Sequence, residues 1–206
     1  MPLVRRGTTP PPEPAVAEDR AHALEALRSA DPDVRWNAAR TFQNDPVGVV
    51  ALAAALETEP VQRVREAIMT ALMRIGTDAS VKALLPYLRW QDAARRGAAI
   101  EALQSLPDAS APFMSALLRD QDNDVRILAI ELVRGMPAEQ ATTLLCRLLE
   151  HENHPNVCAS AIDALADLGT EEALPILRAC ARRFAKTPFL PFAISTAIAR
   201  ISDTKG

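Results

Sequence analysis

Apolar side chains recur at intervals of three and four residues along most of the chain, which is the spacing of one face of an α-helix. From about residue 18 onward, short stretches with this pattern are separated by Pro, Gly, Asp or Asn. Such residues interrupt helices or cap their free N–H groups, so each of them marks a helix end. Long runs of Val and Ile are missing, and the pattern predicts an all-helical protein.

One segment of the pattern returns at a regular interval. The stretch "DPDVRWNAARTF", which contains Val34, is matched around Val64, Ala94, Val125 and Val157. These positions are separated by 30, 30, 31 and 32 residues. Apolar residues stand four and eight positions after each of them, which gives one apolar stripe on a helix. The stripe consists of Ala38, Ile68, Ala98, Ala129 and Ala161, followed by Phe42, Leu72, Ala102, Val133 and Leu165.

A helix break follows each repeated segment, so each repeat is interpreted as a pair of antiparallel helices. The breaks lie at Pro46, Gly76, Pro107, Pro137 and Gly169. A single pair cannot bury both of its faces, whereas stacked pairs share a continuous core. The sequence therefore predicts an all-α fold, an α-solenoid of six helix pairs that start near residues 18, 46, 77, 108, 138 and 170.

The repeated segments "DPDVRWNAARTF" and "DNDVRILAIELV" resemble the second helix of HEAT-like repeats, in the short-period variety named after phycobilisome (bilin) lyases. The resemblance extends from about Asp19 to Ser202. It implies either an adaptor that holds partner proteins or a lyase-type protein that handles a bilin chromophore. No set of residues in the chain marks the lyase activity clearly enough to assign catalytic residues from this resemblance.

The first 17 residues differ from the rest, because they are rich in Pro and lack helical periodicity. We expect residues 1–17 to be a disordered tail and residues 18–206 to form the repeat array. "PPEP" in this tail also fits a ligand for an aromatic groove. Apolar residues make up 49% of the chain but aromatic residues only 4%, so Ala and Leu dominate the expected core.

Charge and cysteine content narrow the functional classes. The net charge of −3 argues against nucleic-acid binding, because phosphate contacts need clustered Lys and Arg. Three Cys do not suggest a disulfide framework, and they fit a reducing compartment. Arg5 and Arg6 are not followed by the apolar stretch of an export signal, and no stretch has the length and apolarity of a membrane span. We expect a cytoplasmic protein that does not engage a membrane.

An arginine recurs beside the repeated Val or Ala, at Arg35, Arg65, Arg95 and Arg126. One interpretation is structural, in which each guanidinium pairs with an acidic or carbonyl group nearby. The nearby carboxylates include those of Asp31, Asp33, Asp92, Asp122 and Asp124. The other interpretation is a row of anion-binding groups. The structural interpretation is favoured, because a repeated residue suggests a repeated need.

Trp36 and Trp90 lie outside the repeat pattern, and Arg40 and Tyr87 accompany them in the sequence. Exposed aromatic rings beside arginines suit a flat ligand with carboxylates, and they suit a protein-binding hot spot equally. Half-buried packing is the alternative. The second helices of the first three pairs are therefore expected to carry a basic surface for an acidic or carboxylate-bearing partner. Its residues are Arg35, Trp36, Arg40, Arg63, Arg65, Arg95 and Arg96.

The last helical stretch, residues 187–202, is more apolar than a terminal helix needs to be. Its apolar positions cover an arc of about 240° at 100° per residue. Two alternatives remain open. Phe189 and Phe192 fold back over the preceding helix, or they contact another chain, as a homodimer or as a docking site for a partner.

Four possible metal ligands, Cys146, His151, His154 and Cys158, fall within 13 residues. Their spacings lack a CxxC pair and Cys146 lies in the apolar run "LLCRLL", so we expect neither a metal nor another cofactor. Gly-rich phosphate loops and the GxSxG and HExxH motifs are also missing from the sequence. We predict a non-catalytic protein-interaction scaffold. The alternatives are a bilin lyase-type protein and a nucleic-acid-binding solenoid.

Overall fold

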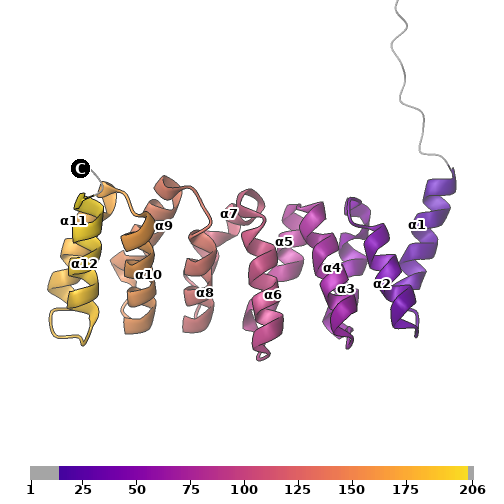
Figure 1. The fold of residues 1–206 in the computed structure, drawn as a ribbon, viewed down its shortest axis with the longest axis horizontal. Coiled ribbons are helices and arrows are strands. Elements are labelled where there is room, and N and C mark those ends of the chain that lie inside the picture. Colours follow the sequence, from indigo (N-terminus) through magenta and orange to yellow (C-terminus); the bar gives the residue numbers. More distant parts are fainter. Residues whose placement is uncertain (1–13, 204–206) are drawn as a thin grey trace, which may run out of the picture. The chain divides into compact units, whose positions relative to one another are not determined.

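The structure is a computed structural model that describes residues 14–203, which form helices and connecting turns (Figure 1). The α-helices are α1 (Pro14–Ala26), α2 (Pro32–Thr41), α3 (Val49–Thr58), α4 (Gln62–Ile75), α5 (Asp78–Leu84), α6 (Ala93–Gln104), α7 (Pro107–Leu117), α8 (Asn123–Val133), α9 (Ala138–His151), α10 (Pro155–Leu168), α11 (Leu174–Arg183) and α12 (Leu190–Asp203). Three short 3-10 helices are η1 (Pro46–Gly48), η2 (Leu85–Arg89) and η3 (Glu171–Ala173). The all-helical prediction is confirmed.

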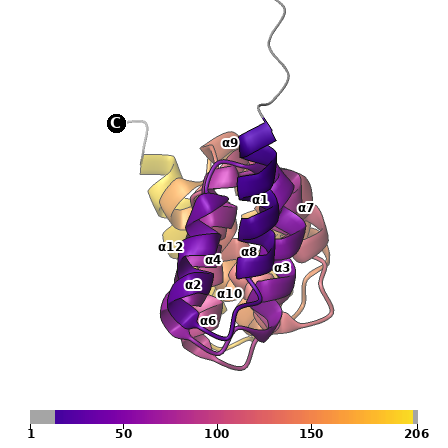
Figure 2. The same ribbon diagram turned by 90° about the vertical axis from the view of Figure 1, so that its right-hand side faces the viewer.

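The helices form two compact units, Met1–Ala83 and Leu84–Gly206. In the first unit α1 packs on α2, α3 packs on α4, and α2 packs on α4. Figure 2 shows that α1 and α3 form one layer there and α2 and α4 the other. In the second unit α8, α10 and α12 pack side by side, and each packs on the preceding first helix, α7, α9 or α11. The predicted α-solenoid of helix pairs is confirmed.

The chain enters the first pair earlier than expected. Helix α1 begins at Pro14, inside the stretch expected to be a tail. Proline suits this first helical position, because its φ angle is already helical and its missing N–H would have no partner there. The rest of the expected tail, residues 1–13, lies outside the described residues.

Helix α5 is short, and its end coincides with the boundary between the two units. Pro86 follows it, and the chain continues as the 3-10 helix η2. Proline lacks the N–H that an α-helix needs at this point and disfavours helical backbone at the residue before it. The α-helix therefore ends at Leu84, and η2 packs on α6 in place of a longer first helix.

The predicted apolar stripe forms the core of most pairs. Val64, Val125 and Val157 are fully buried at the start of α4, α8 and α10. Ala129 and Ala161, four residues later on α8 and α10, are also fully buried. Small side chains at these positions let neighbouring helices approach closely, so the core has no room for added methylene groups.

The predicted register is wrong by one residue in the third pair. Ala99 is fully buried on α6, whereas Ala98 is only half-buried and Ala94 is exposed. The physical reason is the position of the helix cap, because the capping residue fixes where the helix begins. The Asp92 side chain caps α6 and stands four residues before Arg96. Asp31 and Asp122 cap α2 and α8 four residues before their own arginines. Arg96, and not Arg95, is thus the repeated arginine.

The repeated arginines bind backbone carbonyl groups at the turn before their own helix. The Nη1 atoms of Arg35 and Arg65 donate to the carbonyl oxygens of Ser29 and Glu59, at 2.8 and 3.1 Å. Arg96 and Arg126 donate in the same way to the carbonyl oxygens six residues before them, at 2.5 and 2.6 Å. The structural interpretation of the repeated arginine is confirmed. Its function is to close each turn between the two helices of a pair.

Two of these arginines also form a buried ion pair with a glutamate of the next pair. Arg35 Nε lies 2.7 Å from Glu59 Oε2, and Arg126 Nε lies 2.7 Å from Glu152 Oε2. Both glutamates also accept backbone N–H groups, Glu59 from Val61 and Glu152 from His154. The main acidic partners are therefore these glutamates and not the aspartates close in sequence, because the guanidinium points toward the next helix pair.

Substitution of Ala129 or Ala161 by Leu should lower the free energy of unfolding by about 1–3 kcal/mol, because the close-packed stripe cannot accept the larger side chain. Ala199→Leu on the exposed side of α12 is the matched control and should change it little. Urea denaturation of the three variants measures the effect. Equal midpoints for all three would show that these alanines do not lie in the core.

Glu59→Gln should reduce the loss of stability in acid. The hydrogen bond from Arg35 holds the pKa of Glu59 below its usual value, against the opposing effect of burial. The ionised carboxylate therefore stabilises the fold above the unfolded pKa of about 4.3, and this contribution is lost as the pH falls through the lower folded pKa. The variant should be less stable at neutral pH and should lose less stability between about pH 5 and pH 3. Chemical denaturation as a function of pH is the measurement, and exposed Glu57→Gln is the control.

Candidate functional site

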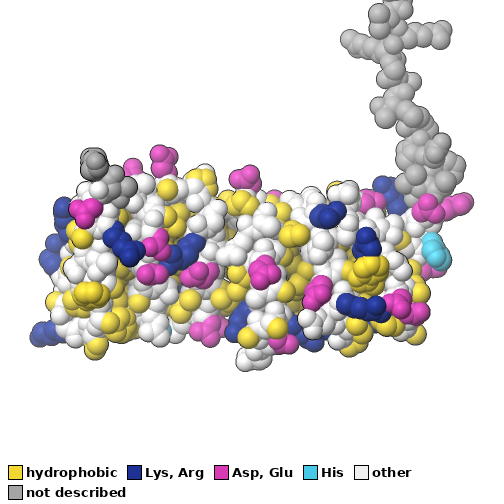
Figure 3. All heavy atoms as spheres, in the orientation of Figure 1, with side chains coloured by type: hydrophobic (Ala, Val, Ile, Leu, Met, Phe, Trp, Pro, Cys, Tyr) yellow, Lys and Arg dark blue, Asp and Glu magenta, His cyan; other side chains and the backbone are white. Residues whose placement is uncertain are grey.

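Helix α2 carries an arginine stacked on a tryptophan. The guanidinium carbon of Arg40 lies 4.4 Å from the centroid of the Trp36 ring. The two residues are four positions apart, which places them one above the other on the helix surface. Trp36 is half-buried and Arg40 is exposed. Figure 3 shows basic side chains on either side of an apolar patch over this helix.

Neither residue of this pair is required by the repeat. The positions equivalent to Trp36 in the next four second helices hold Glu66, Gly97, Ile127 and Ala159. The positions equivalent to Arg40 hold Thr70, Glu101, Glu131 and Asp163. Three of those four side chains are acidic, so Arg40 has the opposite charge to most residues at the equivalent position.

Arg63 on α4 extends the basic surface in the first unit. It forms an ion pair with Asp33, and its side chain remains 52% exposed. The carbonyl-binding Arg35 and Arg65 contribute less to this surface, because their donors are already engaged in the turns. We therefore define the α2 surface as Trp36, Arg40 and Arg63.

A second arginine–tryptophan stack lies in the second unit. The guanidinium carbon of Arg95 lies 4.5 Å from the centroid of the Trp90 ring. Its Nε lies 3.4 Å from the Asp92 carboxylate. The shift in register explains the unusual place of Arg95, since it occupies the position where Val64 and Val125 are buried. Arg96 is the carbonyl-binding residue here, so the structure separates the roles of these two adjacent arginines.

The exposed face of the second unit holds an ion-pair network that the sequence reasoning missed. Arg134 after α8 binds Asp163 and Asp167 of α10, at 2.6 and 2.9 Å, and Arg200 of α12 binds Asp167 at 2.9 Å. Burial disfavours the charge of Arg134, but its hydrogen bonds to the two aspartates hold its pKa above the ordinary value. Figure 3 shows the interleaved basic and acidic side chains over these helices. The sequence did contain a signal for this network, since acidic residues recur at the positions equivalent to Arg40.

The two C-terminal phenylalanines are exposed. Phe189 is 54% and Phe192 is 77% accessible, whereas Phe184 at the end of α11 is buried. Of the two alternatives, folding back over α11 does not agree with this exposure, because Phe184 is the ring that enters the core there. Phe189 also has a φ angle of 58°, a left-handed conformation that is costly for a bulky side chain. Contact of the two rings with another chain stays a prediction.

The structure does not bring the four possible metal ligands together. Cys158 is fully buried, whereas the His151 side chain is 85% exposed. Burial raises the pKa of Cys146 to about 11 and that of Cys158 to about 12, which disfavours the thiolate that a metal would need. Among residues 14–203, no group of three or more His, Cys, Asp or Glu side chains is placed to hold a metal ion. In the same range, no helix is long and apolar enough to cross a membrane.

Comparison with known families agrees with the stacked helix pairs. A model of HEAT repeats matches residues 21–104 and 110–185. The chain belongs to the HEAT repeat family. No curated protein matches its sequence at a significant level.

Several solved structures are similar to this HEAT repeat chain. An archaeal HEAT-like repeats protein from Thermococcus onnurineus NA1 has a TM-score of 0.47 and 13% identity, covering 94% of this chain and 95% of that chain. A designed armadillo repeat protein in complex with the peptide (KR)4 has a TM-score of 0.45 and 16% identity, covering 87% and 98%. A phycocyanin lyase complex from Nostoc sp. PCC7120 has a TM-score of 0.38 and 18% identity, covering 97% and 100%. These similarities concern the helical-repeat fold alone.

Phe189→Gly should leave the free energy of unfolding unchanged or raise it by up to about 1 kcal/mol, because glycine adopts the left-handed conformation at little cost. Phe184→Ala is the contrasting variant and should lower it by about 3–5 kcal/mol, since that ring is buried. Guanidinium denaturation measures both. A clear loss of stability in Phe189→Gly would show that this ring packs within the fold.

Proposed function

We propose that the protein is a non-catalytic interaction module that binds an acidic protein segment through the α2 surface. The observation that carries this proposal is the Arg40 guanidinium stacked on Trp36, at a position where other second helices are mostly acidic. A repeat scaffold does not need such a stack, so its presence is better explained by a ligand.

The chemistry of the stack suits a carboxylate beside an apolar side chain. A guanidinium that lies flat on an aromatic ring keeps the N–H donors along its edge, and these match the two oxygens of a carboxylate. The ring supplies apolar contact area at low entropic cost. Arg and Trp are the residue types that most often dominate binding energy at protein interfaces.

The Arg95–Trp90 stack offers the same chemistry in the second unit. Its guanidinium is partly neutralised by Asp92, whereas Arg40 forms no ion pair with another described residue. We therefore assign the main role to Arg40. The family supports the role as a protein-binding module, because stacked helical repeats commonly use their extended exposed surfaces to bind other proteins.

A bilin is the second candidate ligand for the α2 surface. Its flat ring system with carboxylates would match the flat Trp36 ring and the Arg40 charge, and the sequence resembles the bilin lyase variety of HEAT-like repeats. Titration of the protein with biliverdin, followed by absorbance and fluorescence, tests this alternative. An unchanged bilin spectrum rejects it.

Arg40→Glu should weaken binding of the physiological partner by at least about 30-fold, which corresponds to the loss of a hot-spot residue worth about 2 kcal/mol. Affinity capture from the native host, followed by titration of the captured partner, is the measurement. Arg74→Glu is the matched control, because it makes the same charge change on an exposed position of α4. Binding to the wild type should also weaken as the salt concentration rises. Equal binding by the two variants, or binding insensitive to salt, would contradict the role of the α2 surface.

A further inference from the structure

An open cleft lies between α7 and α9 in the second unit, on the layer of first helices. Its cavity volume is about 240 Å³. Leu118, Leu144 and Leu148 supply apolar lining, and Arg119, Arg147 and His151 are exposed side chains that border it. The cleft thus combines an apolar surface with cationic groups. We refer to it as the α7–α9 cleft.

The carboxylates that line this cleft are already paired. Glu152 is bound by Arg126 at 2.7 Å, and Asp120 is bound by Arg89. In contrast, the side chains of Arg119 and Arg147 form no hydrogen bond or ion pair with any described residue. The cleft therefore has two guanidinium groups available for an external anion.

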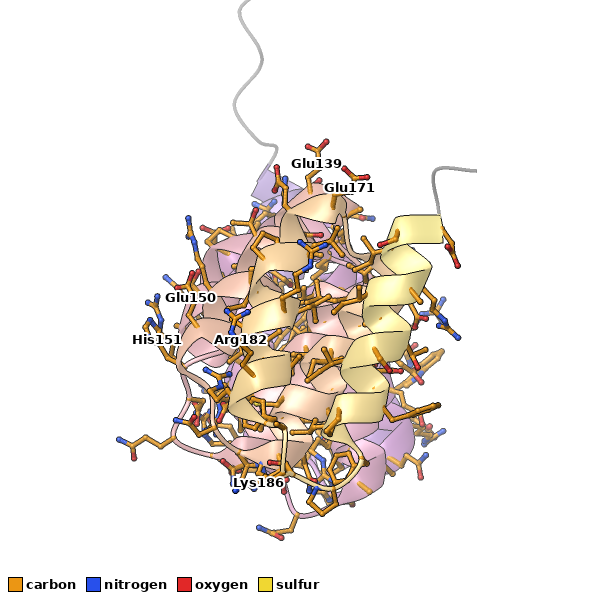
Figure 4. The ribbon with its side chains drawn as sticks, turned by 90° about the vertical axis from the view of Figure 1, so that its left-hand side faces the viewer. Glu139, Glu150, His151, Glu171, Arg182 and Lys186 are labelled. Atoms are coloured by element: carbon orange, nitrogen blue, oxygen red, sulfur yellow. The ribbon has the colours of Figure 1, made fainter. Side chains whose placement is uncertain are left out.

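His151 and Glu150 stand at the outer edge of α9. Figure 4 shows the two side chains close to each other and directed away from the helices, and His151 Nε2 lies 3.8 Å from Glu150 Oε2. This exposed carboxylate offsets part of the positive charge at that end. The surplus charge of the cleft consequently rests on Arg119 and Arg147.

The first unit contains the same cleft without this chemistry. The cleft between α1 and α3 is lined by the equivalent ion pair, Arg35 with Glu59, and by Arg28 in the place of Arg119. Its α3 wall is made of small side chains. Ala51, Ala54, Ala55 and Thr58 stand where α9 has Leu144, Arg147, Leu148 and His151.

This internal comparison separates the scaffold from the specific residues. The Arg–Glu ion pair occurs in both clefts, so it does not distinguish them. Leu144, Arg147 and His151 occur in only one of them, although Ala and Thr at the same positions are compatible with the fold. Folding therefore does not explain why α9 carries larger and cationic side chains here.

We propose that the α7–α9 cleft is a binding site for a peptide segment that carries carboxylates beside an aliphatic side chain. The aliphatic side chain would lie against Leu144 and Leu148, and the carboxylates would accept hydrogen bonds from Arg119 and Arg147. This inference rests on the proposed function as an interaction module, but it concerns a different surface in the other unit.

Two other occupants fit the cleft less well. Residues 1–13 of this chain contain Arg5 and Arg6 but only one carboxylate side chain, Glu13, so their charge has the same sign as that of the cleft. A second copy of the chain would have to bring an acidic segment to the cleft, and it would change the oligomeric state. The test below distinguishes both cases.

The test measures the fluorescence anisotropy of a labelled octapeptide of alternating Glu and Leu, mixed with the full-length protein. The double variant R147A/H151T replaces the two polar side chains of the α9 wall by those at the equivalent positions of α3, Ala54 and Thr58, and leaves Leu144 and Leu148 in place. This variant should fold with an unchanged thermal midpoint and bind the peptide at least tenfold more weakly than the wild type. Arg182→Ala on α11 is the matched control, because Arg182 is exposed on the same layer but does not line the cleft. It should bind like the wild type.

A second peptide, in which Gln replaces every Glu, should bind at least tenfold more weakly to the wild type. Equal binding of the two peptides, or wild-type affinity in R147A/H151T, overturns the proposal. A wild-type dimer that R147A/H151T converts to a monomer in sedimentation analysis would assign the cleft to a second copy and also overturn it. An affinity that rises when residues 1–13 are deleted would assign it to that segment. Arg40→Glu should leave the affinity unchanged, so failure here is distinguishable from failure of the α2 surface.

Discussion

The arginine near the start of the second helix is the interaction on which the repeat depends. Its guanidinium donates hydrogen bonds to backbone carbonyls in the turn between the two helices of a pair. In two of the pairs it reaches a buried glutamate of the next pair as well. One side chain therefore closes a turn and joins neighbouring pairs. A lysine would not serve equally well, because its single ammonium group lacks the fixed geometry of the guanidinium donors.

Much of the fold was predictable from the sequence, because the helix signals are local. The breaks and the apolar stripe gave the number of helix pairs and the core residues around Val64 and Val125. The error in the third pair has a simple cause. "AARR" presents two candidate arginines, and only the cap at Asp92 shows which of them is equivalent to Arg35. The position of the helix cap is thus a better marker of register than the similarity of the residues that follow it.

The candidate sites were less predictable, because they depend on residues distant in sequence. Glu59 and Glu152 follow their arginines by 24 and 26 residues, and nothing local links them. The network around Arg134 joins three helices, and the α7–α9 cleft appears only when two first helices lie side by side. For the C-terminal phenylalanines, the sequence indicated an excess of apolar surface. It could not indicate that Phe184 would occupy the core and leave Phe189 and Phe192 exposed.

The two charged faces of the molecule also differ for a physical reason. On the second unit, Arg134 and Arg200 are neutralised by aspartates of α10, so this face has little charge left for a ligand. On α2, Arg40 rests on a ring and retains its charge. The number of basic residues on a face therefore does not show whether it can bind an anion. The partners of those residues do show it.

The recurrence of one cleft in two units has a consequence for how such a chain acquires new ligands. Both clefts contain the Arg–Glu ion pair. Four positions on the first helix decide whether the wall carries small side chains or larger apolar and charged ones. Specificity can therefore change by a few substitutions, without an insertion and without disturbing the core. In a repeat protein of this kind, one copy of the cleft can acquire new side chains while the other copies keep those that the fold needs.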